Sequence, residues 1–534
     1  MELFPAAKWW RVAFVAAIGS FLLTRALLLS AFPIFNDEAI YLQYSQAIHD
    51  DWEKNRFISM NGIYADWKPP LQYWLAAPLI RCGNDPLLAG RAVAAVMSFL
   101  GLLGGYLFAR ELFGTREAVV AAWLFVLCPT VLFHNVQFTA ETFLFSTAPI
   151  LYWALLQAMG RSKRRWLGAI VAVLSATALL LFKQSALLLL LLGAVLPLVR
   201  FARSGERGTG GWSFAECDRR ALAVDLLLLA GVMFVANLAA SFVIPVDFDV
   251  TRERFDSHWV MSAREILQLP IAIWRVNLSI IGEYVGAYYS WIAALFFGVC
   301  AWLAIRRKDF GQMGLLLMCV AGGGAIIFLL REFNEYMVNT AVVAVLLPLL
   351  ARGSVMMWDL SRGGRTRWLR AVFLAAAAGM SACWCYQIVL MHGAPGRYIE
   401  RSTRWAVANY LTGWSTGFGV KEVVAMLEKE PGTGVIFADP QWGNPRTALE
   451  VYASERFPKL RVVEVSREFL DSVQLRELRD VARRLGPARF LIFSPGTPWP
   501  PHGEWLRDAE REMCEERTEV KAWPGQMPIV VCRF

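Results

Sequence analysis

The chain has 534 residues, of which 57% are hydrophobic and 18% are charged, and its mean hydropathy is +0.43. This composition excludes an ordinary soluble protein, an intrinsically disordered chain and a collagen-like fibre. The net charge of +9 is compatible with a nucleic-acid partner, so the positions of the basic residues have to decide that question.

Eleven apolar segments are each long enough to cross a membrane as a helix of about 20 residues. Most basic residues lie between these segments, and alternating the sides of the membrane gathers the basic clusters on one face. By the positive-inside rule this face is cytoplasmic. The basic excess therefore indicates topology, and we expect a lipid bilayer and no nucleic acid as a partner. The segments lie near residues 9–31, 88–109, 117–133, 136–158, 166–182, 184–200, 221–244, 286–305, 313–330, 337–351 and 371–391.

Three segments lie on the outer side of the membrane in this topology: residues 32–87, residues 245–285, and everything after about 392. In the last segment, apolar runs rich in β-branched residues alternate with helical patterns, which is typical of a small α/β domain. We therefore predict an all-α polytopic domain over residues 1–391 and an extracytoplasmic α/β domain over 392–534. The expected location is the inner (plasma) membrane.

The nine cysteines show no metal-binding spacing. Most lie in expected spans, where cysteine behaves as a small apolar residue. Cys514 and Cys532 both belong to the outer domain, where an oxidising compartment allows a disulfide. The sequence leaves open whether they form one or are two buried thiols.

An acidic pair, Asp37 and Glu38, follows the first span and opens a short segment with apolar residues at helical spacing. One interpretation is structural: Asn36 or Asp37 caps that helix, and Glu38 favours its positive end. The other interpretation is catalytic, because a carboxylate at the membrane boundary can act as a general base.

Lys68 stands where paired prolines start another helix in the same outer segment. A lysine at this level either extends towards lipid headgroups or contacts the phosphate of a lipid substrate. Lys183 and Arg331 are the basic residues of the short outer turns, and each has the same two interpretations.

Two further features are weaker. Arg25 lies inside the first span, where a charge is costly unless it is paired inward, so Asp37 or Glu38 is a candidate partner. His134 and Glu141 lie seven residues apart, close to one helical face, and fit either a metal site or polar packing in the bundle.

The order of these motifs resembles a known family. A first span, then Asp-Glu-x-x-Tyr ending at Tyr41, then Lys-Pro-Pro-Leu-x-Tyr-Trp beginning at Lys68, and then Arg91, is similar to the integral-membrane glycosyltransferases of the GT-C superfamily. Within this superfamily, the chain resembles the lipid A aminoarabinose transferases and the protein O-mannosyltransferases. The resemblance covers roughly residues 20–200, is fainter around 331–350, and does not extend to most of the C-terminal domain.

The resemblance implies an inverting transfer of one sugar from a polyprenyl-phosphate carrier to a glycolipid, polysaccharide or protein acceptor outside the cytoplasm. Asp37 matches the catalytic carboxylate, Glu38 supports it, and Lys68 matches the lysine that meets the carrier phosphate. Lys183 and Arg331 are further candidates for phosphate contacts. No cofactor is certain, and a divalent metal stays an alternative. Weaker candidates for the substrate pocket are Tyr41, Asp66, Glu141, Tyr336 and Arg25.

One departure from the aminoarabinose transferases concerns the residue before Lys68. An acidic residue often stands there in that group, whereas this chain has Trp67, with Asp66 one position earlier. If that carboxylate binds a metal or an acceptor in the family, its role here is in doubt.

Two rival functions fit the composition. A transporter or flippase of lipid-linked saccharides should show paired inverted halves and ionisable residues near the middle of the membrane, and the sequence indicates neither. A non-catalytic envelope assembly protein would not need the acidic pair for its activity.

Overall fold

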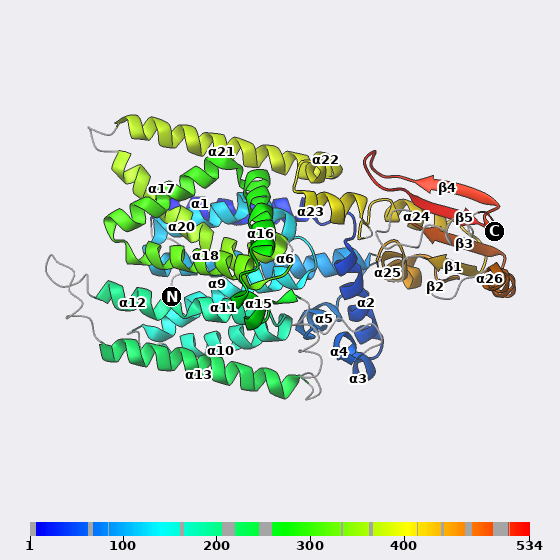
Figure 1. Cartoon of the computed structure of the whole chain (residues 1–534), viewed down its shortest axis with the longest axis horizontal. Coiled ribbons are helices and arrows are strands. Elements are labelled where there is room, and N and C mark those ends of the chain that lie inside the picture. Colours follow the sequence, from blue (N-terminus) through cyan, green and yellow to red (C-terminus); the bar gives the residue numbers. More distant parts are fainter. Residues whose placement is uncertain are drawn as a thin grey trace.

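The computed structural model describes residues 7–61, 68–83, 85–160, 165–204, 219–244, 259–332, 335–361, 367–413, 415–438, 443–464, 472–494, 511 and 513–534. It consists of a bundle of long helices and a smaller sheet domain beyond one end of that bundle (Figure 1). The predicted fold class, an all-α membrane domain followed by an α/β domain, is confirmed.

All eleven expected spans fall on helices. Among the described residues, nine helices or helix pairs are long and apolar enough to cross a membrane, and residues 186–201 form a shorter apolar pair. The remaining segment, near 117–133, is divided by Pro129 into α7 and α8. The helices of the bundle are α1 (Lys8–Leu28), α6 (Pro86–Phe113), α7 (Thr115–Leu127), α8 (Pro129–His134), α9 (Ala140–Met159), α10 (Arg165–Phe182), α11 (Ala186–Gly193), α12 (Val195–Ser204), α13 (Arg219–Val243), α16 (Ile271–Tyr284), α17 (Ser290–Arg307), α18 (Phe310–Leu329), α19 (Glu335–Val338), α20 (Ala344–Ser361) and α21 (Arg367–Gly393).

α6 and α9 pack closely in the bundle interior, because glycines of α6 let the two backbones approach each other. A Cβ atom on Gly101 would lie 2.8 Å from the Cα of Ser146, and one on Gly104 would lie 2.5 Å from Cγ1 of Ile150. Small residues serve this purpose in membrane bundles, where packing rather than water exclusion holds helices together.

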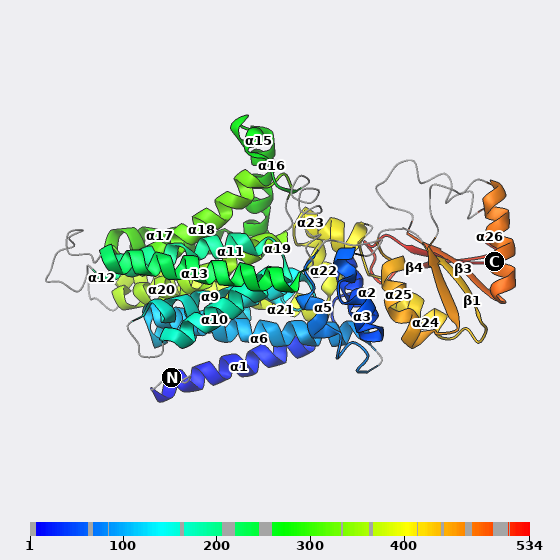
Figure 2. The same cartoon turned by 90° about the horizontal axis from the view of Figure 1, so that it is seen from below.

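α16 corrects the sequence interpretation of the second outer loop. Residues 271–284, which that interpretation assigned to the loop, form a helix that continues through a π-helical turn, Val285–Tyr289, into α17. Arg275, Asn277 and Glu283 made this segment look too polar for a span. Together with α15 (Ala263–Leu267), α16 projects sideways from the bundle (Figure 2).

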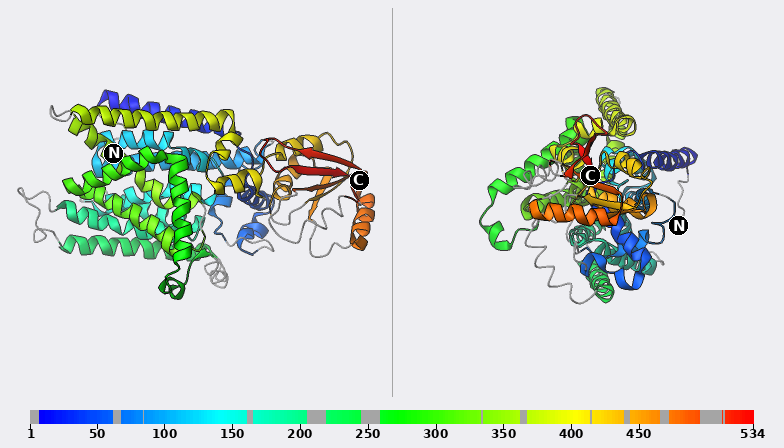
Figure 3. Two further views of the ribbon diagram at one scale, coloured as in Figure 1. Left: turned by 45° about the horizontal axis from the view of Figure 1, so that its top comes forward. Right: turned by 90° about the vertical axis from the view of Figure 1, so that its right-hand side faces the viewer.

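Short helices cover the end of the bundle that faces the sheet domain. α2 (Asn36–Asp50) lies between the bundle and the sheet domain (Figure 3) and packs on both α6 and α25. The other short helices are α3 (Trp52–Asn55), α4 (Ile58–Asn61), α5 (Leu71–Ala76), α22 (Pro395–Glu400), α23 (Arg404–Val407) and a π-helical turn, Ala408–Thr412.

The sheet domain contains one five-stranded sheet in the order β2-β1-β3-β5-β4. β1, β2 and β3 are parallel, and β5 and β4 are antiparallel to their neighbours. Alternate residues of β1 and β3 pack on α24 and α25 on one face and on α26 on the other. The elements are α24 (Val420–Leu427), β1 (Gly434–Ala438), α25 (Arg446–Arg456), β2 (Leu460–Glu464), α26 (Ser472–Leu485), β3 (Ala488–Phe493), β4 (Glu516–Val520) and β5 (Ile529–Arg533).

Cys514 and Cys532 form a disulfide in this domain, with their Cα atoms 5.0 Å apart. The alternative that the sequence left open is therefore settled in favour of the bond. A disulfide of this kind is typical of an oxidising compartment.

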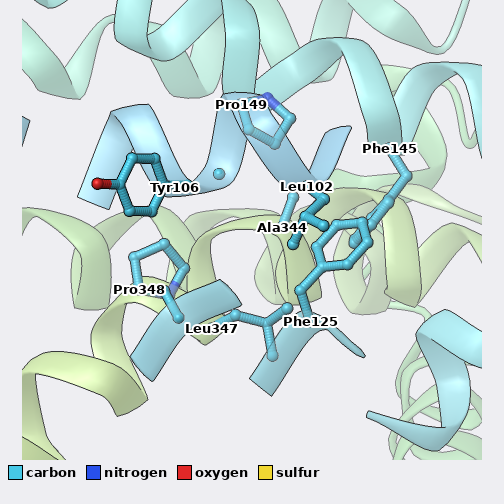
Figure 4. Close-up of a pocket in the computed structure, with 10 residues that line it drawn as sticks. Leu102, Tyr106, Phe125, Phe145, Pro149, Ala344, Leu347 and Pro348 are labelled. Carbon is cyan, nitrogen blue, oxygen red and sulfur yellow. The ribbon is translucent and has the colours of Figure 1, made fainter. Parts of the chain in front are cut away.

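A small apolar pocket lies inside the bundle between α6, α7, α9 and α20 (Figure 4). Pro149 of α9 and Pro348 of α20 line it together with Leu102, Phe125 and other apolar side chains. Since its lining carries no charged side chain, this pocket is not the candidate site for a phosphate or a sugar.

Candidate active site where the bundle meets the sheet domain

The start of α2 determines where the predicted acidic pair lies. The N-cap residue is Phe35, whose backbone N–H donates to Oε2 of Glu38 at 3.1 Å. Asn36 and Asp37 lie within the first helical turn, so the expectation that one of them is the N-cap residue is wrong. Glu38 caps the helix in their place, because its carboxylate reaches back to the free N–H of Phe35.

Glu38 is fully buried and forms an ion pair with Arg91, which is also fully buried. Nε of Arg91 donates to Oε1 at 2.9 Å, and Nη2 donates to Oε2 at 2.7 Å. The backbone N–H of Phe138 donates to Oε1 at 2.8 Å. With the bond from Phe35, this carboxylate accepts four hydrogen bonds, and the pair joins α2 to α6.

Arg91 also holds the chain that connects α1 to α2. Its guanidinium donates to the carbonyl oxygens of Leu29, Phe32 and Pro33 at 2.9, 2.8 and 2.9 Å. An arginine that is wholly enclosed by acceptors fixes the backbone around it. Arg91 therefore fixes both the start of α2 and the connection that precedes it.

Asp37 differs from its neighbour in being only half-buried. It lies near Tyr410, whose pKa is raised well above its usual value by burial and further by the nearby carboxylates of Glu38, Asp37 and Glu335. Tyr410 therefore stays neutral and donates its hydroxyl hydrogen to Oε1 of Gln137 at 2.7 Å. Of the acidic pair, Asp37 is the carboxylate that a substrate can reach.

The sheet domain contributes to the same region through Asn444, at the start of α25. This buried side chain donates from Nδ2 to the carbonyl oxygens of Ile34 and Ser415, both at 3.1 Å. The backbone N–H of Asn36 also donates to the carbonyl of Ser415, at 3.2 Å. The residues just before Asp37 are thus held from the domain side as well as from the bundle side.

Lys68 lies against Tyr41. Tyr41 stands one helical turn after Asp37, on the same face of α2. Its ammonium group donates to the hydroxyl of Tyr41, and Nζ lies 4.4 Å from the centre of that ring. The hydroxyl of Ser59 donates to the backbone carbonyl of Lys68 at 2.8 Å, which fixes the lysine's backbone. Residues four apart in a helix are neighbours, so Asp37 and Tyr41 lie on one face of α2, and Lys68 contacts Tyr41.

Lys183, Glu141 and Tyr336 form a second group. The ammonium of Lys183 is paired with the carboxylate of Glu141, and both side chains are buried. Nζ of Lys183 lies 5.7 Å from the centre of the Tyr336 ring. Three of the sequence candidates, from α9, the turn after α10 and α19, are therefore in contact.

Arg331 is held elsewhere. Its Nη2 donates to both carboxylate oxygens of Glu265 in α15 at 2.7 Å, and its backbone N–H donates to the carbonyl of Trp259 at 2.9 Å. The hydrogen bond from Arg331 is the main cause that lowers the pKa of Glu265 to about 2. These contacts favour a structural role for Arg331, which fastens the segment before α16 to the bundle.

Arg25 does not pair with Asp37 or Glu38, so that expectation is wrong. Nη1 of Arg25 donates to the carbonyl of Val126 at 3.3 Å, and its guanidinium lies 4.4 Å from the centre of the Phe21 ring. The reason is geometric: α1 presents Arg25 to α7, while Arg91 of α6 occupies the place beside Glu38.

The described residues hold no group of three or more histidine, cysteine or acidic side chains that fits a metal ion. Glu141 is paired with Lys183 rather than with His134. Asp66 and Trp67, the positions where this chain departs from the aminoarabinose transferases, lie outside the described residues.

Comparisons with known proteins identify a matching family model and similar folds. Residues 67–204 match the family model described as dolichyl-phosphate-mannose-protein mannosyltransferase. This match begins just before Lys68 and includes Arg91, Glu141 and Lys183. No curated protein sequence matches the chain closely enough to be counted as a relative.

Solved structures are similar over almost the whole chain. ArnT from Cupriavidus metallidurans in the apo state has a TM-score of 0.56 and 14% identity, and the alignment covers 99% of this chain and 98% of ArnT. The same protein bound to undecaprenyl phosphate gives a TM-score of 0.54 with 14% identity and 98% of each chain covered. The oligosaccharyltransferase of Archaeoglobus fulgidus in the apo form gives 0.51 with 12% identity, covering 90% of this chain and 69% of that one. The chain has the fold of these structures. The GT-C type of fold that the motifs implied is confirmed.

Arg91, Tyr410 and Asn444 are components of the site that sequence reasoning did not assign. A signal existed for Arg91, because an arginine within an apolar span needs an inward partner, and Glu38 is that partner. No comparable signal existed for Asn444, since its contacts with the start of α2 join residues more than 400 positions apart.

Proposed function

We propose that this protein transfers a monosaccharide from a polyprenyl-phosphate donor to an acceptor hydroxyl, with inversion at the sugar carbon. The supporting observation is that Asp37 and Tyr41 share one face of α2 and that Tyr41 holds Lys68. A carboxylate and an ammonium group on one face are the two charges that this reaction needs. ArnT of C. metallidurans, which shares the fold, has been solved bound to undecaprenyl phosphate.

In the proposed reaction, Asp37 takes the proton of the acceptor hydroxyl while the hydroxyl oxygen bonds to the sugar carbon. The bond between that carbon and the phosphate oxygen breaks, and the electron pair leaves with the polyprenyl phosphate. Lys68 stabilises the charge that grows on the leaving phosphate. Lys183, from the group that it forms with Glu141 and Tyr336, supplies a second cation. Glu38, held by Arg91, positions Asp37 without reacting. No step of this proposal passes through a metal ion.

The direct test of the function compares lipid extracts of cells with and without the gene. Loss of the enzyme should accumulate a polyprenyl-phosphate sugar and deplete one glycolipid, polysaccharide or glycoprotein. The purified protein should then transfer radiolabelled sugar from that accumulated lipid to the depleted acceptor. A flippase would instead move the donor lipid across vesicle membranes without transferring its sugar.

The proposed side of the membrane is the extracytoplasmic side of the plasma membrane, for both the site and the sheet domain. The charge alternation of the spans and the disulfide of the sheet domain support this orientation. A reporter that works only outside the cytoplasm should be active when fused after Phe534 and inactive when fused at Gly205. The opposite result at both positions would invert the topology.

A further inference from the structure

Five buried polar side chains gather where α8 and the start of α9 meet α19 and the π-helical turn Asn339–Val343. We call them the polar cluster: His134, Asn135, Gln137, Glu335 and Asn339, each at most 2% exposed. Nδ2 of Asn339 donates to Oδ1 of Asn135 at 3.3 Å. Tyr288 connects Glu335 with His134. The hydroxyl of Tyr288 donates to Oε2 of Glu335 at 2.8 Å, and the centre of its ring lies 6.4 Å from the centre of the His134 ring.

Every member of the polar cluster has a polar atom without a hydrogen-bond partner among the described residues. These atoms are both ring nitrogens of His134, Nδ2 of Asn135, Nε2 of Gln137, Oε1 of Glu335 and Oδ1 of Asn339. A buried polar group that is left without a partner destabilises the fold. The polar cluster is therefore a candidate site for a bound molecule that supplies the missing hydrogen-bond partners.

The polar cluster combines donors and acceptors in one place. The side-chain amides of Asn135 and Gln137 offer N–H groups, while Glu335 and Asn339 offer oxygens. A sugar hydroxyl both donates and accepts, so a ring carrying several hydroxyls matches this mixture. A phosphate, which only accepts, would leave the oxygens of Glu335 and Asn339 without donors.

Aromatic side chains line the same region. The ring centre of Tyr336 lies 6.5 Å from that of His134 and 5.7 Å from that of Trp405. The C–H face of a sugar ring is apolar and packs on aromatic faces, while its hydroxyls turn to the polar groups.

The polar cluster lies between the two groups of the proposed active site. Tyr336 contacts both His134 and the ammonium of Lys183. Tyr410 donates to Gln137 and lies near Asp37 and Glu335. α19 and α23 lie at the end of the bundle that faces α2 (Figure 2). In a polyprenyl-phosphate sugar the ring is bonded directly to the phosphate, so its site must adjoin both the phosphate contacts and the base.

We propose that the polar cluster recognises the donor's sugar, and that this sugar is a neutral polyhydroxylated ring. This inference rests on the proposed function and names the residues that select its donor. Hydroxyls of the sugar donate to Glu335 and Asn339 and accept from Asn135 and Gln137. The side chains of the polar cluster, rather than Lys68, then distinguish one sugar from another.

The test compares binding of bare and sugar-bearing carriers to the full-length protein in detergent. The probes are undecaprenyl phosphate and the same lipid carrying mannose, glucose, galactose or arabinose. The wild type should bind at least one sugar-bearing lipid about tenfold more tightly than the bare lipid, as expected for several neutral hydrogen bonds. Glu335→Gln and Asn339→Ala should remove most of this preference and leave affinity for the bare lipid unchanged.

Gln312→Ala is the matched control, because Gln312 is also a buried amide with an unpartnered oxygen but lies at the start of α18, outside the polar cluster. It should keep the sugar preference even if it lowers thermal stability. Lys68→Ala should weaken bare and sugar-bearing lipids alike.

Two results would overturn the inference: an unchanged sugar preference in both variants, or an equal loss of affinity for bare and sugar-bearing lipids. A wild type that transfers a sugar but shows no preference for that sugar-bearing lipid would also overturn it, while the proposed function stands. If the wild type transfers no sugar and Lys68→Ala leaves binding of the bare lipid unchanged, the proposed function itself fails.

Discussion

Glu38 and Arg91 form a fully buried ion pair between α2 and α6, and the carboxylate beside it, that of Asp37, is only half-buried. The two adjacent acidic residues, Asp37 and Glu38, thus have different environments. Glu38 is committed to four hydrogen bonds, two of them from Arg91, so it is poorly suited to exchange a proton during a reaction. Asp37 keeps the accessibility that a base needs.

Arg91→Met should strongly destabilise the protein. The substitution leaves the carboxylate of Glu38 buried without its cation, and breaking a buried pair in this way costs about 3–5 kcal/mol. Thermal unfolding in detergent measures the loss. Arg81→Met is the control, because Arg81 pairs with Asp50 at the exposed end of α2. A difference of less than about 1 kcal/mol between the two variants would contradict the structural role of Arg91.

Lys68→Ala should weaken binding of undecaprenyl phosphate about tenfold to a hundredfold, since a charge-assisted contact contributes about 1.5–3 kcal/mol. Lys68→Arg should retain part of the affinity because the charge remains while its geometry changes. Lys54→Ala, at an exposed lysine of α3, is the control. Unchanged affinity in Lys68→Ala would contradict a contact between this lysine and the carrier phosphate.

Particular residues explain which helices and strands the sequence predicts and which it does not. Hydropathy located the helices of the bundle other than α16, because a span must be apolar over its whole length. It misjudged α16, whose Arg275, Asn277 and Glu283 interrupt the apolar pattern. In the sheet domain, the apolar runs at 434–438, 489–493 and 529–532 are β1, β3 and β5. β2 and β4 contain several charged residues and were missed.

In the candidate site, too, the local features could be predicted from sequence and the long-range contacts could not. Local spacing along α2 suffices to place Asp37 beside Tyr41, and the short motif around Lys68 was recognisable. The sequence offered Asp37 or Glu38 as the partner of Arg25, whereas Glu38 pairs with Arg91. Sequence does not show which face of a span turns inward. The polar cluster joins α8 and α9 to α19, about 200 residues away, and only the folded chain brings these together.

Asn444→Ala tests whether the sheet domain positions the start of α2. The variant removes the donor to the carbonyls of Ile34 and Ser415, so Asp37 should lose its alignment while the phosphate contacts stay intact. We expect kcat to fall about tenfold with the Kd for undecaprenyl phosphate unchanged. A 1 Å displacement near a reacting group is sufficient for losses of this order.

Asn55→Ala is the control for Asn444→Ala, because Nδ2 of Asn55 donates to the carbonyl of Ala47 near the other end of α2. It should leave kcat near that of the wild type. Equal effects of the two variants on kcat, or a parallel loss of kcat and lipid binding in Asn444→Ala, would assign Asn444 to general stability.

The central claim is that Asp37 acts as the general base, and Asp37→Asn tests it most directly. Asparagine keeps the size of the side chain and removes the proton acceptor, and Phe35 rather than Asp37 is the N-cap residue, so no cap is lost. Asp50→Asn, at the end of the same helix, is the matched control. The measurement is transfer of radiolabelled sugar by purified variants, with binding of undecaprenyl phosphate determined beside it. The base role predicts a loss of about a hundredfold to ten-thousandfold in kcat for Asp37→Asn alone, with lipid binding retained, whereas wild-type turnover in that variant would contradict the proposed mechanism.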